Sequence, residues 1–141
     1  GMGHASQIAL GIAMAKQNKQ VACFDGDGAV LMHMGSLPLI GRSECENFLH
    51  IVFNNGVHDS VGGQPTIGRD IELTQVAAAC GYSLSLRAST PRTFNSALDT
   101  VLTKPGPNFI EVVIDPGNRP DIGRPTSKPE DNKFLLMDVL G

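Results

Sequence analysis

The sequence predicts an α/β fold, a three-layer arrangement in which a parallel β-sheet carries helices on both faces. Short apolar runs alternate with helical patterns along most of the chain, and this alternation is typical of parallel sheets. Two apolar runs end in polar, glycine-containing loops, at Asp25–Gly28 and at Asn54–Gly56. The chain has 141 residues, which is enough for one domain with a substantial core.

The first elements are a helix and a strand. Residues 6–17 are rich in alanine and large apolar side chains and come soon after the Gly-Met-Gly sequence at residues 1–3, so they predict a helix that starts at a loop. Gly11 within this helix indicates close packing rather than high helix propensity. Val21–Phe24 then predicts a buried strand that meets the Asp25–Gly28 loop.

A second buried strand, Leu49–Phe53, meets the Asn54–Gly56 loop. The segment between the two strands is long enough for a crossover helix, although Gly35, Pro38 and Gly41 weaken it. The unit is therefore predicted to be a right-handed crossover between parallel strands.

The remaining elements continue the alternation. Residues 56–70 predict a long loop, and long loops in compact domains tend to be functional. Further predictions are a helix over 71–80 with Asp70 as N-cap and Gly81 as its stop, a strand over 82–86, a helix from Thr90-Pro91 that ends at 104–107, and a strand over 109–114.

The character of the chain changes near residue 116. Residues 1–115 are expected to form the folded domain, whereas prolines and polar residues predict an extended arm over 116–141. The arm ends in Phe134-Leu135-Leu136-Met137. We expect this apolar end to pack on the same subunit or on a neighbouring one.

Composition excludes several classes of function. The net charge of −3 and the absence of a Lys/Arg cluster argue against a nucleic-acid partner. No apolar stretch is long enough to span a bilayer, and no signal peptide is evident. The three scattered cysteines predict reduced, mostly buried thiols and a cytoplasmic location rather than a disulfide framework.

An acid and an amide are expected at one edge of the sheet. Asp27 and Asn55 follow the first two predicted strands, and ligands of open α/β folds bind where such strands end. Carboxylate and amide oxygens suit Mg²⁺, which also binds phosphate oxygens. Gly28 lets the backbone approach a phosphate. Asp25 is a second acid, expected to fix the loop or cap the following helix.

These motifs resemble a known family. Gly26-Asp27-Gly28, a spacer and Asn54-Asn55 look like the signature of thiamine diphosphate enzymes, in their diphosphate-binding domain. Three further stretches resemble the phosphonopyruvate decarboxylase branch, which is close to sulfopyruvate decarboxylase. These stretches are residues 1–6 (GMGHAS), 54–66 (NNGVHDSVGGQPT) and 122–126 (IGRPT).

The resemblance implies the thiamine diphosphate-binding fold and a set of roles. Asp27, the side chain of Asn55 and the main-chain carbonyl of Val57 would bind Mg²⁺. Met2 would prop the cofactor into its bent shape. The other cofactor-binding residues implied are Gly3, Gly26, Gly28 and Ala29.

Two residues of the long loop are candidates for catalysis. His58 is a candidate for binding the anionic end of the substrate or for proton transfer, because imidazole changes charge near neutral pH. Asp59 is a weaker candidate. A loop histidine is often simply solvated, and a loop carboxylate often binds backbone N–H groups. His33 and His50 look like a helix-start and a strand-edge residue, and no role is assigned to them.

The resemblance further implies a decarboxylase that is not complete in this chain. In the family, a glutamate on a separate pyrimidine-binding domain activates the cofactor, and no residue here aligns with it. We therefore expect the cofactor-anchoring half of a 2-oxo acid decarboxylase in a homo- or hetero-oligomer. Its expected reaction converts phosphonopyruvate to phosphonoacetaldehyde and CO₂. Alternatives are the beta subunit of sulfopyruvate decarboxylase, a cofactor-binding module without turnover, or an unrelated flavodoxin-like domain that binds another phosphate ligand or a protein partner.

Overall fold

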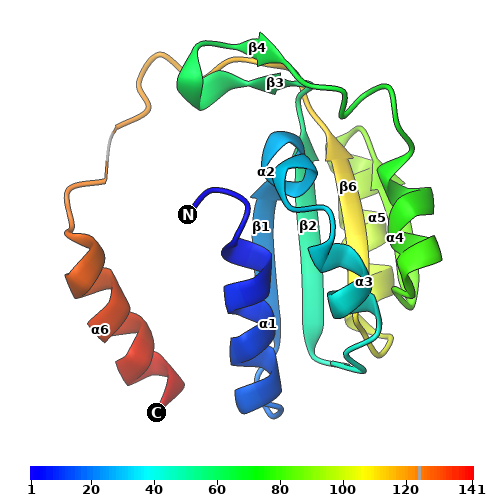
Figure 1. Ribbon diagram of the computed structural model, residues 1–141, viewed down its shortest axis with the longest axis vertical. Coiled ribbons are helices and arrows are strands. Elements are labelled where there is room, and N and C mark those ends of the chain that lie inside the picture. The colour runs from blue at the N-terminus through cyan, green and yellow to red at the C-terminus, as the bar shows by residue number, and fades with distance from the viewer. Residues whose placement is uncertain (124) are drawn as a thin grey trace.

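The computed structural model describes residues 1–123 and 125–141. Its main sheet has four parallel strands in the order β1-β2-β6-β5, formed by Val21–Gly26, Phe48–Asn54, Asn108–Val113 and Leu84–Ala88. The central strands β2 and β6 are buried along almost their whole length, as expected for a parallel sheet covered on both faces. The predicted α/β architecture is confirmed (Figure 1).

Helices cover both faces of the sheet. One core cluster joins α1 (Ala5–Ala15), α2 (Asp27–Met32), α3 (Ser36–Gly41) and α4 (Leu73–Cys80) to one face. The second cluster joins α5 (Pro91–Leu102) to the other face. On that second face the edge strand β1 stays open, and Phe24 is 63% exposed.

Several predicted boundaries are confirmed. Helix α5 begins at Pro91 with Thr90 as N-cap, and the side chains of Thr90 and Thr93 form a reciprocal capping box. Helix α4 ends at Gly81, whose φ of 102° is readily adopted only by glycine. Strands β5 and β6 lie within one or two residues of the predicted ranges.

Other local predictions are wrong. The predicted single crossover helix is two short helices. Helix α2 is followed by His33 as its C-cap, and α3 starts only after Gly35, with Pro38 in its first turn. The N-cap of α4 is Glu72, not Asp70, whose backbone N–H instead closes a turn with Ile67. His33 ends a helix rather than starting one.

The predicted loop over 56–70 contains a small antiparallel hairpin. Strand β3 (Val57–His58) pairs with β4 (Gln64–Pro65) around a single 3₁₀ turn, η1 (Asp59–Val61). The hairpin lies above the carboxyl ends of the main strands, beside α2 (Figure 1). Its position brings the following residues back toward the first strand.

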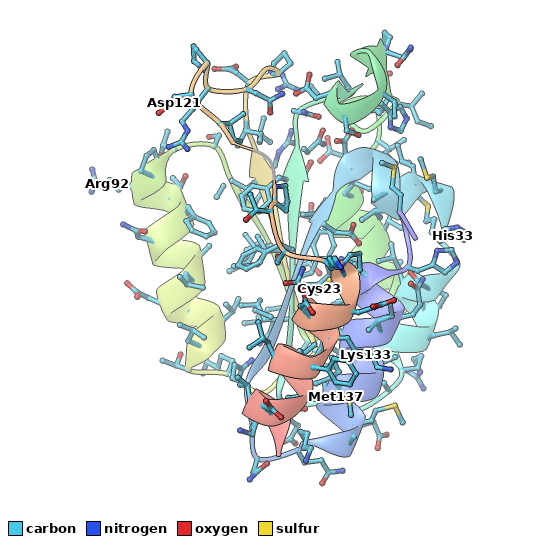
Figure 2. All side chains as sticks on the ribbon, turned by 90° about the vertical axis from the view of Figure 1, so that its left-hand side faces the viewer. Cys23, His33, Arg92, Asp121, Lys133 and Met137 are labelled. Atoms are coloured by element: carbon cyan, nitrogen blue, oxygen red, sulfur yellow. The ribbon has the colours of Figure 1, made fainter. Side chains whose placement is uncertain are left out.

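Within the predicted extended arm, residues 129–140 form a helix, whereas the described residues from 116 to 128 are in no helix or strand. Helix α6 (Pro129–Leu140) begins with proline at its first position and has Glu130 and Asp131 in its first turn, features that favour a helix start. Lys16 and Lys19 donate hydrogen bonds to the last carbonyls of α6, at Gly141 and Val139. Apolar side chains of α6, Met137 among them, stay exposed (Figure 2). Docking of this end on another surface therefore stays a prediction.

None of the helices in the described ranges combines the length and the apolar character needed to cross a bilayer. All three cysteines are free; Cys23 and Cys45 are buried and Cys80 is partly buried.

Candidate cofactor site

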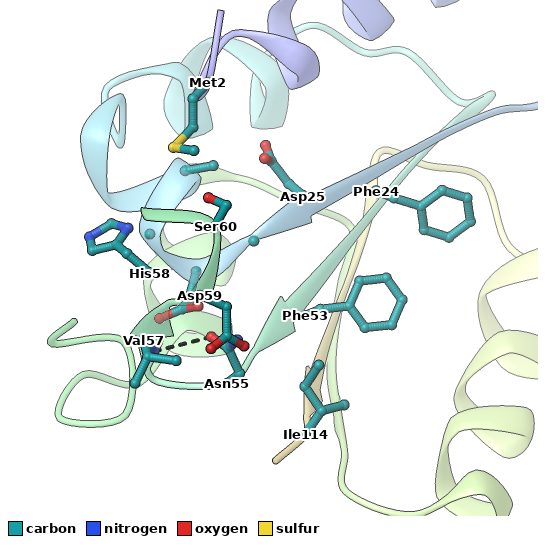
Figure 3. A pocket seen from close by; sticks show the side chains of 14 residues that line it. Met2, Phe24, Asp25, Phe53, Asn55, Val57, His58, Asp59, Ser60 and Ile114 are labelled. Carbon is teal, nitrogen blue, oxygen red and sulfur yellow. Dashed lines mark hydrogen bonds between the residues drawn. The ribbon is translucent and has the colours of Figure 1, made fainter. Parts of the chain in front are cut away.

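A cavity of about 450 Å³ opens at the carboxyl ends of β1 and β2 (Figure 3). It is formed by the β1–α2 junction, the end of β2, the hairpin and the N-terminal loop. The predicted site residues that line it are Met2, Gly26, Asp27, Gly28, Ala29, Asn55, Val57, His58 and Asp59. The remaining lining residues are Phe24, Asp25, Phe53, Ser60 and Ile114. The topology therefore assembles nearly all of the predicted residues in one place.

Gly3 is the one predicted site residue outside this lining. It is buried, and its φ of 81° favours glycine. A Cβ there would lie 2.5 Å from the His33 ring and 3.0 Å from the carbonyl oxygen of Ala29. Gly3 therefore sets how closely the N-terminal loop approaches α2.

Asp27 is the first residue of α2, and it is only 1% exposed. Its carboxylate accepts a hydrogen bond from the hydroxyl of Thr66. No ion pair found in the described part of the chain includes Asp27. A buried carboxylate without a cationic side chain is costly, so a bound cation suits this position.

Asn55 follows β2 and presents its amide to the same cavity. Its Oδ1 accepts a hydrogen bond from the backbone N–H of Val57 at 3.1 Å, and its Nδ2 donates to Asp59 Oδ2 at 2.8 Å. These contacts fix the orientation of the amide. A carbonyl oxygen has two lone pairs, so Oδ1 keeps one for a cation.

Gly28 gives the floor of the cavity its shape. A Cβ at Gly28 would lie 2.3 Å from Cε1 of His58, so the imidazole packs directly on the backbone of the β1–α2 junction. His58 is thereby held at the cavity wall and is half-buried rather than simply solvated. Asp59 instead accepts hydrogen bonds from Asn55 and from the backbone N–H of Gly117 at 2.9 Å. This engagement matches the backbone-binding alternative for a loop carboxylate.

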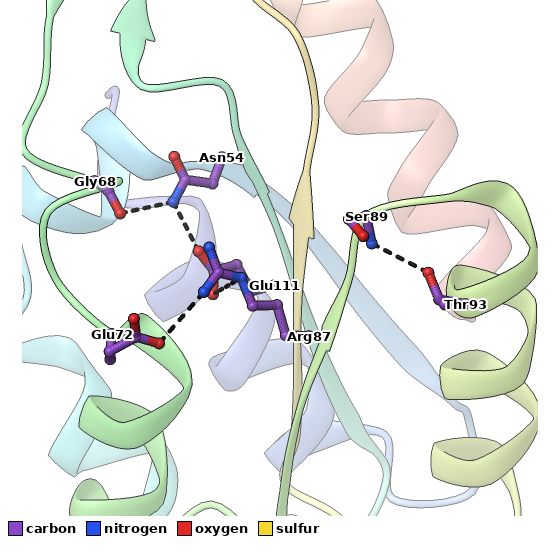
Figure 4. Close-up of polar contacts among 7 residues, drawn as sticks. All are labelled: Asn54, Gly68, Glu72, Arg87, Ser89, Thr93 and Glu111. Carbon is purple, nitrogen blue, oxygen red and sulfur yellow. Dashed lines mark hydrogen bonds and ion pairs between the residues drawn. The ribbon is translucent and has the colours of Figure 1, made fainter.

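A polar network behind the cavity connects Asp27 to the centre of the sheet. Thr66 Oγ1 also accepts the N–H of Gly68, and the carbonyl of Gly68 accepts a hydrogen bond from Asn54 Nδ2 at 2.7 Å. Asn54 Nδ2 also donates to Glu111 Oε1 at 2.7 Å (Figure 4).

Arg87 completes this network at the surface. Its guanidinium lies 3.6 Å from Glu111 Oε2 and 3.4 Å from Glu72 Oε2. Asn54 and Glu111 are almost fully buried, at 0% and 1% exposure. Sequence reasoning assigned neither residue a role, although polar residues inside apolar strands were a visible signal.

Asp25 neither caps α2 nor bonds to the loop after it, in contrast to the prediction. The N-cap of α2 is Gly26, and no side chain caps the helix. Asp25 lies on the inner face of β1, with its Oδ2 3.5 Å from Nε2 of His50. His50 is in an interior strand and is fully buried, so its assignment as a strand-edge residue is wrong.

These features define a parallel α/β domain with a cavity at the carboxyl edge of its sheet, lined by the polar side chains of Asp27 and Asn55 and by Gly26 and Gly28. Residues 1–112 match the family described as "Thiamine pyrophosphate enzyme, C-terminal TPP binding domain". The chain belongs to this family, whose cofactor is thiamine diphosphate.

Curated relatives carry more specific names. The chain is 41% identical over 128 residues to a phosphonopyruvate decarboxylase of Streptomyces viridochromogenes, covering 91% of this chain and 32% of the relative. It is 35% identical over 139 residues to the sulfopyruvate decarboxylase subunit beta of Methanococcus maripaludis, covering 99% of this chain and 74% of the relative. The chain therefore spans about a third of the phosphonopyruvate decarboxylase but most of the sulfopyruvate subunit.

Solved structures support the fold. A thiamine diphosphate-dependent 4-hydroxybenzoylformate decarboxylase of Rhodococcus jostii superposes with a TM-score of 0.69 at 20% identity, covering 84% of this chain and 24% of that chain. A transketolase of Campylobacter jejuni gives a TM-score of 0.65 at 19% identity, covering 79% and 20%. At this identity the similarity establishes the fold alone.

The cavity suits the family's cofactor. Carboxylate, amide and main-chain carbonyl oxygens are the ligands that Mg²⁺ prefers, and Asp27, Asn55 and Val57, which carry these groups, line one cavity. Gly26 leaves its backbone open beside them, because nothing lies within 4 Å of a Cβ built there, whereas the imidazole of His58 covers Gly28. One stretch of the tail resemblance cannot be placed, because Arg124 lies outside the described residues.

Proposed function

We propose that this chain is the cofactor-anchoring part of a thiamine diphosphate- and Mg²⁺-dependent 2-oxo acid decarboxylase that acts on phosphonopyruvate. The observation that carries the proposal is the convergence of Asp27, Asn55, Val57 and Gly28 on one cavity at the ends of β1 and β2. The names of its relatives support the substrate class. The reaction would release CO₂ and phosphonoacetaldehyde.

Each residue has a distinct role in this proposal. Asp27, Asn55 and the carbonyl of Val57 hold Mg²⁺, and Gly26, Gly28 and Ala29 lie against the diphosphate. Met2 supports the cofactor from the N-terminal loop, and Gly3 lets that loop approach α2. When bound there, the cofactor would supply the nucleophile and the electron sink that decarboxylation of a 2-oxo acid needs.

His58 is the proposed catalytic group of this chain. Its imidazole lies at the cavity wall, where it can hold the anionic end of the substrate or move a proton. Asp59 acts beside it by orienting Asn55, in keeping with its hydrogen bonds. The glutamate that activates the cofactor would come from a pyrimidine-binding domain on another chain or chain segment.

A second substrate is favoured by one observation. The match to the sulfopyruvate decarboxylase beta subunit covers nearly the whole chain and most of that relative, which suits a hetero-oligomer. Phosphonopyruvate and sulfopyruvate differ only in their anionic end group, so both belong in the same assay.

The test has two steps. Calorimetry of the chain with thiamine diphosphate, with and without Mg²⁺, should show metal-dependent binding that is lost in Asp27→Ala and retained in Asp121→Ala, which changes an exposed acid. CO₂ release is then measured with a pyrimidine-binding partner chain and either substrate. Absence of metal-dependent binding would refute the cofactor site and favour the flavodoxin-like alternative. Binding without turnover in the presence of partner would leave only a binding module, and turnover by the chain alone would refute the divided active site.

A further inference from the structure

Three polar side chains, called here the Tyr82–His50–Asp25 relay, cross the core from the end of α4 to the cofactor cavity. Tyr82 follows α4, His50 lies in the middle of β2, and Asp25 is near the carboxyl end of β1. Tyr82 Oη lies 3.1 Å from His50 Nδ1, and His50 Nε2 lies 3.5 Å from Asp25 Oδ2. All three residues are buried, at 5%, 0% and 8% exposure.

The proton positions in this relay follow from the acceptor at its end, the carboxylate of Asp25. A carboxylate accepts hydrogen bonds, so Nε2 must carry the imidazole proton to interact with Asp25. Nδ1 is then the acceptor for the Tyr82 hydroxyl. Burial raises the pKa of Tyr82 well above its usual range, so the hydroxyl keeps its proton. One tautomer, Nε2–H, therefore suits both contacts: Nδ1 accepts the Tyr82 hydroxyl, and the N–H at Nε2 faces Asp25.

The imidazole is also held by its neighbours. The ring of His50 packs edge-to-face on Phe109, with centroids 5.4 Å apart, and on Phe48 at 6.1 Å. The Tyr82 ring lies roughly parallel to it at 6.3 Å and contacts Phe109 as well. These aromatic contacts restrict rotation, so Nε2 is directed at Asp25 and not elsewhere.

Only one end of the relay reaches the cavity. Asp25 lines the cavity floor, and its carboxylate points to the side where Met2 lies (Figure 3). Its Oδ2 is buried without a hydrogen-bond partner within normal range, as is Nε2 of His50. Because Oδ2 faces the imidazole at 3.5 Å, Oδ1 is the oxygen left for a donor in the cavity.

We infer that Asp25 is a hydrogen-bond acceptor for an N–H or O–H donor of the bound cofactor, and that His50 and Tyr82 are positioning residues that hold its carboxylate in place. This inference rests on the proposed function. Purely apolar residues would fill the same core without the cost of burying three polar groups. We attribute the presence of this buried polar relay to the position of Asp25 in a binding site.

Cys23 offers the competing explanation. Its thiol, the Asp25 carboxylate and the His50 imidazole lie within 4.8 Å of one another, as in a metal site. Burial, with a smaller effect of Asp25, raises the pKa of Cys23 to about 11. The thiol therefore carries its proton near neutral pH in the metal-free chain, and a metal would have to displace that proton on binding.

The first test reads the tautomer by ¹⁵N NMR of the full chain. The wild type should show His50 as the Nε2–H form, and Tyr82→Phe, which removes one oxygen, should loosen that preference. The Nδ1–H form in the wild type would overturn the relay. This readout does not depend on cofactor, so it decides the relay even if the proposed function fails.

The second test measures the affinity for thiamine diphosphate with Mg²⁺. Asp25→Asn and His50→Phe should weaken binding about tenfold, the effect of losing a hydrogen bond to a charged group. His50→Gln, which retains a donor, should restore part of it. Ser85→Ala removes a buried hydroxyl outside the relay and should change nothing. Wild-type affinity in both Asp25→Asn and His50→Phe would overturn the inference. A Cys23-dependent thiolate absorption band on addition of Co²⁺ would also overturn it. A wild type that does not bind cofactor at all would instead count against the proposed function.

Discussion

The carboxylate of Asp59 holds the amide of Asn55 in a fixed orientation. Asp59 Oδ2 accepts a hydrogen bond from Asn55 Nδ2 at 2.8 Å and another from the backbone N–H of Gly117 at 2.9 Å. Only the oxygen of an amide can bind a cation, and the contact of Nδ2 with Asp59 fixes the direction in which Oδ1 points. The contact also ties the start of the C-terminal segment to the cavity.

Asp59→Ala should therefore weaken Mg²⁺-dependent cofactor binding about tenfold, because residues that orient a metal ligand have effects of this size. Calorimetric titration of Mg²⁺ at saturating thiamine diphosphate measures it. Asp121→Ala serves as the control at an exposed acid. Equal Mg²⁺ affinity in both variants would show that Asn55 needs no such partner.

Thr66→Val should also lower Mg²⁺ affinity. The substitution keeps the shape of the side chain but removes the hydroxyl that donates to Asp27 and accepts the N–H of Gly68. The expected loss is several-fold, on the order of one hydrogen bond. Thr100→Val, whose hydroxyl bonds only to its own helix, is the matched control.

Gly68→Ala should disturb the metal site while leaving the fold intact. A Cβ at Gly68 would lie 2.4 Å from Asp27 Oδ2 and 2.8 Å from Asp27 Cβ, so the acid must move. Gly11→Ala is the contrast: Gly11 is exposed and nothing lies within 4 Å of a Cβ there, so the close packing predicted at Gly11 is wrong. We expect Gly11→Ala to raise helix stability by up to about 1 kcal/mol. Circular dichroism and Mg²⁺ titration of both variants check this pair.

Asn54→Ala should destabilise the domain by about 2–4 kcal/mol, because it removes two hydrogen bonds and leaves the buried Glu111 without its donor. Urea unfolding measures the change in free energy. Asn95→Ala, at an exposed position of α5, should stay within about 0.5 kcal/mol of the wild type. A loss of similar size in both would contradict a special role for the buried network.

The raised pKa of the Cys23 thiol leads us to expect that the folded domain loses stability in alkaline solution. Its pKa is raised from 9.0 to about 11 in the folded chain, so the unfolded chain loses its proton first. The stabilising effect is full below pH 9 and falls as the pH rises toward 11, by on the order of 1–3 kcal/mol. Urea unfolding at pH 8 and pH 10.5 should show a smaller decrease for Cys23→Ala than for the wild type.

Local sequence signals predicted the parts of the fold that depend on neighbours in sequence. Thr90-Pro91 and Gly81 marked a helix start and a helix end because capping chemistry is local. The continuous apolar runs at β2 and β6 reflect burial on both faces. The paired Asp27 and Asn55 were found because parallel strands present their ends at a common edge.

The missed features depend on contacts between distant residues. Glu111 and Asn54 are 57 positions apart, and nothing in their local sequence shows that they meet. His50 resembled an edge residue because its partners Asp25 and Tyr82 come from other elements. Helix α6 was not predicted for a different reason. The prolines before it favour an extended segment, although Pro129–Asp131 carry signals for a helix start.

The hydrogen bond from the Thr66 hydroxyl to Asp27 links the ordering of the segment after the hairpin to the charge at the proposed Mg²⁺ site. The segment after the hairpin is held partly by Asp27, the acid proposed to bind Mg²⁺. Thermodynamic reciprocity then requires that any cation favouring the ordered loop binds more tightly when that loop is in place. Backbone amides near Gly68 should accordingly exchange with solvent deuterium more slowly once magnesium is added, which makes this loop a built-in reporter of cation occupancy.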